Sequence, residues 1–170
     1  MDILKAANAW AKAELISTPF FALAGLVFVA VSIGFWQFGK TDLARSYILP
    51  TLIAGVLLVI IGAGLYYTNV KRLSAFELEF NEDPVVFVQN ELARTAATLQ
   101  EYKNVVFTAI PVIIVICAAL LYVLQGPAWK ASMITTIAML SVILLIDGLA
   151  HARIAHYHDQ LVEAKEEYKA

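Results

Sequence analysis

The chain has 170 residues, of which 61% are hydrophobic and 15% are charged, and its formal net charge is −2. With a mean hydropathy of +0.74, this composition is typical of a membrane protein and leaves too few polar residues to cover a soluble core. Because basic residues are not in excess, nucleic acid is excluded as an expected partner. The single cysteine, Cys117, lies in an apolar run, so neither an intramolecular disulfide nor a cysteine-based metal site is predicted.

Residues 1–16 predict a short amphipathic helix. Ile3, Ala7, Trp10 and Ala11 fall on one helical face, and the lysines of this segment fall elsewhere. This pattern predicts an interfacial helix that lies among lipid headgroups, the alternative being a frayed terminus. The segment lacks the pattern of a cleavable secretory signal, so we expect the first span to be retained.

Four stretches without charged residues, or nearly so, approach the roughly 20 residues that a helix needs to cross the hydrocarbon core. Ser17 or Thr18 is expected to cap the first of them, with Pro19 in its first turn. The sequence therefore predicts an all-α membrane protein, with a single domain over 17–170 that contains four transmembrane helices in an antiparallel bundle. The expected spans are about 17–39, 46–70, 104–126 and 129–152.

Lysine and arginine residues indicate the orientation. If the N-terminus is cytosolic, nine of the 12 basic residues lie on the cytosolic side, and only Lys40, Arg45 and Lys130 lie outside. Basic residues favour the cytosolic side of membrane proteins. The sequence thus predicts that both termini are cytosolic.

The second, third and fourth spans are expected to extend into the cytosol as helices. Residues 71–103 predict a helical hairpin, in which Asp83 followed by Pro84 begins the second helix, and residues 153–168 predict a C-terminal helix. The stretch Phe76–Phe80 also fits a strand, but helical spacing with the preceding residues favours a helix. Together these segments predict a cytosolic helical stalk.

Asp147 is the candidate functional residue that the sequence indicates most strongly. An ionisable group near the edge of the hydrocarbon is costly and usually faces a partner, a cavity or a pathway. His151 lies one turn later on the same face, and Thr108 and Lys103 of the third span are expected at the same depth. Asp147 and His151 could hold a metal or relay a proton. Two residues are fewer than a metal-ligand set, which favours the alternative. In that alternative, Asp147 accepts hydrogen bonds from neighbouring helices.

Charged residues also predict pairs between the third and fourth helices. A tight turn at Gly126 and Pro127 makes residues whose numbers sum to about 254 neighbours, if the two helices are antiparallel. The expected interhelical pairs are Arg153 with Glu101, and Arg94 with Asp159 or Glu163.

Within one helix, Glu91 and Arg94 are expected to pair at a spacing of three residues. The turn before this helix is acidic and is expected to be a solvated loop tip or, alternatively, to attract cations. Its acidic residues are Glu77, Glu79, Glu82 and Asp83.

Small residues at helical spacing predict close helix contacts, either within the bundle or between copies. These residues are Ala30 with Gly34, Gly55 with Gly62, and Ala131 with Ala138.

The run from Asp83 to Arg94 resembles a pattern in small bacterial four-span membrane proteins of uncharacterised activity. Several residues that follow this run belong to the same pattern. This resemblance implies a bacterial inner membrane and brings no activity with it. The later residues that carry it are Tyr102, Asp147, Arg153, Tyr157 and Leu161.

No arrangement of a nucleophile, phosphate loop or metal-binding helix is recognisable, so the sequence gives no reason to expect catalysis or a cofactor. The first hypothesis is an accessory or scaffolding protein of the inner membrane, whose stalk docks a protein partner. The second is a subunit of an oligomeric channel or transporter, with Asp147 on the pathway. The third is a metal- or proton-responsive site at Asp147 and His151.

Overall fold

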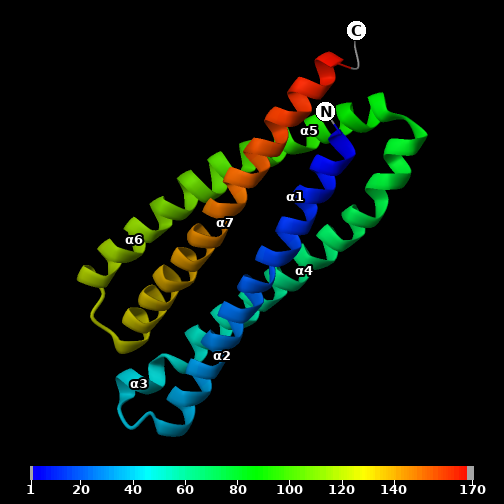
Figure 1. The fold of residues 1–170 in the computed structure, drawn as a ribbon. Helices are drawn as coiled ribbons and strands as arrows, with labels where there is room; N and C mark the ends of the chain where they lie inside the picture. Colours follow the sequence, from blue (N-terminus) through cyan, green and yellow to red (C-terminus); the bar gives the residue numbers. More distant parts are fainter. Residues whose placement is uncertain (1, 168–170) are drawn as a thin grey trace.

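The computed structural model describes residues 2–167, and this part of the chain is almost entirely helical, without strands (Figure 1). Four helical stretches are long and apolar enough to cross a membrane: Ile3–Phe38, Asp42–Glu82, Pro84–Val123 and Pro127–Glu166. This confirms the predicted all-α fold with four helices of membrane-spanning length. The elements are α1 (Ile3–Ser17), α2 (Pro19–Phe38), α3 (Asp42–Ser46), α4 (Ile48–Glu82), α5 (Pro84–Glu101), the π-helix η1 (Tyr102–Ala109), α6 (Ile110–Val123) and α7 (Pro127–Glu167).

The junction between α1 and α2 differs from its prediction. Thr18 has helical dihedral angles, its backbone N–H donates to the carbonyl of Glu14, and its side chain makes no capping hydrogen bond. Pro19 is tolerated because it removes only one backbone donor, and the N–H of Phe21 still donates to the carbonyl of Thr18. Helix α2 thus begins at Pro19 with Thr18 at its N-cap position, as expected, but the expected side-chain cap is absent and α1 continues almost directly into α2 (Figure 1).

The predicted apolar face of α1 is buried, but against protein. Ile3, Ala7, Trp10 and Ala11 belong to one core cluster with apolar residues of α4, α5 and α7. The structure thus covers this face with three other helices, where the sequence predicted lipid headgroups. We call this part of the molecule, residues 3–18, 68–104 and 150–167, the polar end. Its core residues outside α1 are Phe76, Phe87, Val88, Ile154, Tyr157, Leu161 and Ala164.

The turn between α4 and α5 is fixed by a local signal. Helix α4 continues to Glu82, so Phe76–Phe80 is helical, as favoured. The Asp83 side chain caps α5 by accepting from the N–H groups of Val85 and Val86 at 2.9 and 3.0 Å. The Phe87 ring then packs edge-on against Phe76 and Phe80, with centroid distances of 5.6 and 5.5 Å. Capping and aromatic packing together hold the two helices at this corner.

The third apolar helix is interrupted by a π-helical segment that the sequence did not indicate. Helices α5, η1 and α6 follow one another without a loop, as expected from the continuous apolar spacing. Within η1, the hydroxyl of Thr108 donates to the carbonyl of Lys103, five residues earlier, at 2.7 Å. Such segments occur often at functional sites. Helix α7 ends at Glu167, so Tyr168, the last residue of the predicted C-terminal helix, lies outside the described residues.

Helices α2 and α4 approach closely through glycines. A Cβ atom added to Gly25 would lie 2.6 Å from the carbonyl oxygen of Gly55, and one added to Gly62 would lie 2.7 Å from the backbone nitrogen of Ala22. Gly55 and Gly62 therefore form contacts within the molecule, which was one predicted alternative, the other being contacts between copies. Gly25, which contacts Gly55, was not named in the prediction. A Cβ atom on Gly34 would meet nothing within 4 Å.

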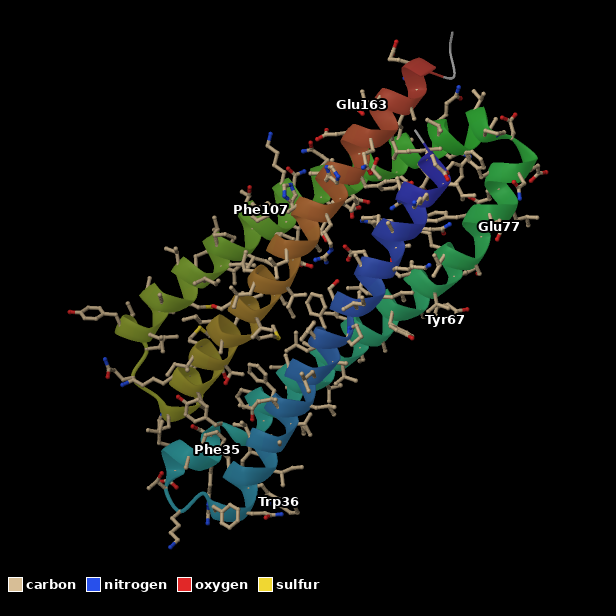
Figure 2. All side chains as sticks on the ribbon, viewed as in Figure 1. Phe35, Trp36, Tyr67, Glu77, Phe107 and Glu163 are labelled. Carbon is tan, nitrogen blue, oxygen red and sulfur yellow. The ribbon has the colours of Figure 1, made fainter. Side chains whose placement is uncertain are left out.

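The membrane-spanning helices form two pairs, α2 with α4 and α6 with α7 (Figure 1). The pairs meet at the polar end and again at the opposite end, where the hydroxyl of Ser46, the last residue of α3, donates to the carbonyl of Pro127 at 3.1 Å. Figure 2 shows Glu77 and Glu163 at the polar end, and Phe35 and Trp36 at the opposite end. We call the parts of the four long helices between these two ends the apolar half.

Candidate functional site

A pocket of about 420 Å³ lies where the polar end joins the apolar half. Residues of α1, α2, α4, α5, η1 and α7 line it, so each of the four long helical stretches contributes. We call it the Asp147 pocket. Its polar lining residues are Glu14, Ser17, Thr18, Asn69, Thr98, Glu101, Tyr102 and Asp147.

Asp147 is half-buried in the wall of this pocket, which Glu14 and Tyr102 also line. From the sequence, Thr108 was expected at the same depth as Asp147 in a candidate polar site. Thr108 is exposed, and its hydroxyl donates to the carbonyl of Lys103 within η1. Asp147 therefore faces a pocket, and Thr108 points elsewhere.

The predicted companions of Asp147 lie elsewhere. The ring of His151 packs edge-on against Tyr102 and Phe107, with centroid distances of 5.5 and 4.9 Å, and His151 does not line the pocket. Lys103 is exposed. Among the described residues, no group of three or more histidine, cysteine, aspartate or glutamate side chains is placed to hold a metal. The geometry thus favours neither a metal site nor a proton relay between Asp147 and His151.

Glu14 is a site residue that the sequence analysis missed. It is 8% exposed, and its carboxylate accepts a hydrogen bond from Nε of Arg153 at 2.9 Å, while Nη2 of Arg153 donates to the hydroxyl of Ser17 at 2.7 Å. Arg153 was expected to pair with Glu101; among the described residues its ion pair is with Glu14 instead. Glu14 follows Ala7 and Ala11 at helical spacing, on the face that was predicted to be apolar. This spacing could have indicated that Glu14 is buried.

Thr18 places a second polar group in the pocket wall. The residue is 3% exposed, and its hydroxyl oxygen is buried without a hydrogen-bond partner. A buried hydroxyl left unpaired costs about 1–3 kcal/mol, which makes it a natural position for a ligand to contact. Thr18 therefore leaves one buried hydroxyl without a hydrogen-bond partner beside the pocket.

A second cluster, deeper in the polar end, centres on Glu91. Arg94 binds it with two hydrogen bonds of 2.6 and 2.5 Å, as expected from their spacing, and the phenol of Tyr157 donates to it at 2.9 Å. Burial, with the charge of Glu91, raises the pKa of Tyr157 above its ordinary value and keeps this donor protonated. The prediction that Arg94 pairs with Asp159 or Glu163 is not met among the described residues, because Glu91 occupies the guanidinium.

Trp10 connects this cluster to α1. Its ring stacks on Tyr157 at 5.3 Å, and the guanidinium carbons of Arg94 and Arg72 lie 4.6 and 5.4 Å from its centroid. Arg72 also donates to the side-chain oxygen of Asn69, a residue of the Asp147 pocket, at 3.1 Å. The cluster therefore supports one wall of the pocket.

Comparison of the chain with protein families, with curated proteins and with solved structures gives no match.

Proposed function

We propose that the protein is an integral membrane protein that binds an organic cation in the Asp147 pocket and, as an oligomer, provides part of the path of that cation across the membrane. The observation that carries this proposal is the charge of the pocket. Three carboxylates, of Glu14, Glu101 and Asp147, line it, and within residues 2–167 no lysine or arginine does.

The charge balance of these carboxylates favours a cationic ligand. Arg153 neutralises Glu14, while Asp147 and Glu101 have no such partner among the ion pairs of the described residues. An ionised carboxylate next to hydrocarbon is costly unless a cation accompanies it. A bound cation would therefore be most stable beside Asp147.

The remaining walls favour an organic cation over a hydrated metal ion. Tyr102 and Phe21 contribute aromatic rings, and apolar side chains of α4, η1 and α7 fill the spaces between the polar groups. Aromatic rings attract quaternary ammonium groups through cation–π interactions, whereas a hard metal ion needs a full shell of oxygen ligands. A volume of about 420 Å³ also exceeds what a single ion requires.

The direct test is the binding of tetramethylammonium by the purified protein in lipid nanodiscs, measured by titration calorimetry. Binding is expected, with an affinity that falls about tenfold or more in Asp147→Asn because one carboxylate charge is lost. Asp42→Asn is the matched control, because Asp42 is exposed on α3 and does not line the pocket. Absent or equal binding in the wild type and Asp147→Asn would refute the proposal.

The same proposal includes an antiparallel arrangement of four spans, with both termini in the cytosol, in a bacterial inner membrane. The excess of lysine and arginine on the side of the termini supports this orientation. Epitope tags at the two termini are expected to resist protease in intact spheroplasts and to be cleaved after lysis. Cleavage of either tag in intact spheroplasts would contradict it.

A second candidate function is that of a scaffold whose polar end docks a protein partner. It is supported by the packed core of the polar end and by the corner between α4 and α5, where Leu78 is 73% exposed and Val85 and Val86 are also exposed among acidic residues. Such a surface suits a partner with a basic, partly apolar face. Gentle purification from the native membrane is expected to retain that partner, and Leu78→Asp to release it; recovery of the chain alone would count against this function.

A further inference from the structure

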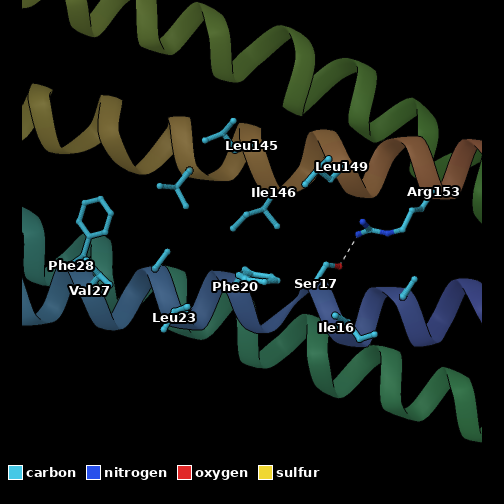
Figure 3. Close-up of a pocket in the computed structure, with 13 residues that line it drawn as sticks. Ile16, Ser17, Phe20, Leu23, Val27, Phe28, Leu145, Ile146, Leu149 and Arg153 are labelled. Carbon is cyan, nitrogen blue, oxygen red and sulfur yellow. Dashed lines mark hydrogen bonds between the residues drawn. The ribbon is translucent and has the colours of Figure 1, made fainter.

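A second cavity adjoins the Asp147 pocket and opens towards the lipid. It is a groove of about 770 Å³ between α2 and α7, which we call the α2–α7 groove. Figure 3 shows Phe20 and Leu23 on one side and Leu145 and Leu149 on the other, with Arg153 at the polar end reaching Ser17. All of the lining is apolar except for Ser17 and Arg153.

The two cavities share a wall. Ser17 and Ile146 line both of them. Glu14 lines the pocket and Arg153 lines the groove, and the two side chains are joined by their ion pair at 2.9 Å. This ion pair therefore forms part of the partition between the lipid-facing groove and the acidic pocket.

The charges on the two sides of the partition differ in sign. In the described part of the chain, Arg153 is the only charged residue that lines the groove, and Glu14 and Ser17 hold it in place. On the other side, the unpartnered hydroxyl of Thr18 and the carboxylate of Asp147 belong to the pocket wall. A cation that crosses the partition can replace Arg153 at Glu14 and gain Asp147 as a second carboxylate.

We infer that the ligand is a cationic amphiphile, which reaches the pocket from the membrane with its alkyl chain in the α2–α7 groove and its ammonium group beside Asp147. This inference rests on the proposed function and names the class of its ligand. The groove offers a continuous apolar surface to the chain, and the pocket offers carboxylates and the aromatic rings of Phe21 and Tyr102 to the head group. The Arg153–Glu14 ion pair acts as the gate between them.

The experiment compares octyltrimethylammonium, tetramethylammonium and octanoate in nanodiscs, with protein-free nanodiscs as the blank. Octyltrimethylammonium is expected to bind about tenfold or more tightly than tetramethylammonium, because each buried methylene favours binding by up to about fourfold. Partition of the chain into lipid raises apparent affinity as well, so variants of the groove provide the decisive comparison.

Ala24→Phe places a bulky ring in the groove, and Ala30→Phe places the same ring on an exposed face of α2 outside it. Ala24→Phe is expected to remove most of the advantage of the octyl chain while leaving tetramethylammonium binding unchanged, and Ala30→Phe is expected to change neither. Thermal unfolding of both variants verifies that they fold.

The outcomes separate the inference from the proposed function. If tetramethylammonium binding depends on Asp147 but the octyl advantage survives Ala24→Phe, the inference is overturned and the proposed function stands. If octanoate binds as tightly as octyltrimethylammonium, Arg153 is an anion site and the inference is again overturned. If neither cation binds, both fail.

Discussion

The polar end and the apolar half of this protein differ in how their helices are held together. At the polar end, α1, α4, α5 and α7 bury large side chains such as Trp10, Phe76, Phe87 and Tyr157 almost completely. In the apolar half, most large apolar side chains stay exposed on the outer faces of the helices. The hydrophobic effect buries apolar side chains where water surrounds the polar end, whereas apolar side chains in lipid gain little from burial against protein.

The apolar half itself contains two kinds of helix contact. Helices α2 and α4 touch backbone to backbone at Gly25 and Gly55, while α2 and α7 leave the groove between them. In lipid, close packing of small residues is the main force that joins helices. The tight α2–α4 pair is therefore a structural contact, whereas the α2–α7 groove is where we propose that the ligand enters.

The largest effect is expected for removal of Trp10, because it lies between α7 and two arginines in the core of the polar end. Trp10→Ala should lower the free energy of unfolding by about 3–5 kcal/mol. Trp36→Ala is the control: Trp36 is 71% exposed at the opposite end, and less than about 1 kcal/mol is expected. Chemical unfolding in detergent measures both, and equal losses would show that the two ends are held alike.

Removal of Glu91 should have the next largest effect. Glu91→Ala leaves Arg94 without its ion-pair partner and Tyr157 without its acceptor, which should cost about 3 kcal/mol. In a double-mutant cycle, Arg94→Ala should cost much less in the Glu91→Ala background than in the wild type. Glu163→Ala, at an exposed position of α7, serves as the control. Strictly additive losses would contradict the coupling.

A smaller effect is expected at the α2–α4 contact. Gly25→Ala brings a methyl group to within 2.6 Å of a backbone oxygen of α4, so the helices must separate, at a cost of about 1–3 kcal/mol. Gly34→Ala meets no atom within 4 Å and should be neutral or stabilise by up to about 1 kcal/mol through helix propensity. Changes of opposite sign in the free energy of unfolding of Gly25→Ala and Gly34→Ala would support a close backbone contact between α2 and α4. Equal changes would contradict it.

The smallest effect is expected at the end opposite the termini. Ser46→Ala removes the hydrogen bond to the carbonyl of Pro127, which should cost below about 1 kcal/mol because water and the remaining backbone can replace it. Hydrogen exchange of α3 should then rise while exchange of the polar end stays unchanged. A loss as large as that of Trp10→Ala would show that this contact, and not the polar end, holds the two helix pairs together.

Features of the site that depend on local pattern could be predicted, and those that depend on packing could not. The buried face of α1 followed from its spacing, but its covering by α4, α5 and α7 did not, because an apolar face fits lipid and protein equally well. The pairing of Arg153 with Glu101 failed for the same reason: α1 inserts beside α7 and brings Glu14 to Arg153. The π-helix η1 further shifts the faces of the third helix relative to the fourth.

By itself, the sequence determined the helical class, the four stretches of membrane-spanning length and the helix start at Asp83, because each depends on residues within a few turns of one another. Only the tertiary structure decided that Asp147 faces a pocket, that Glu14 and Thr18 share it, and that His151 lies apart. These features depend on which helices meet and in what register. In this chain, contacts between residues far apart in the sequence set that register, above all the insertion of α1 into the polar end.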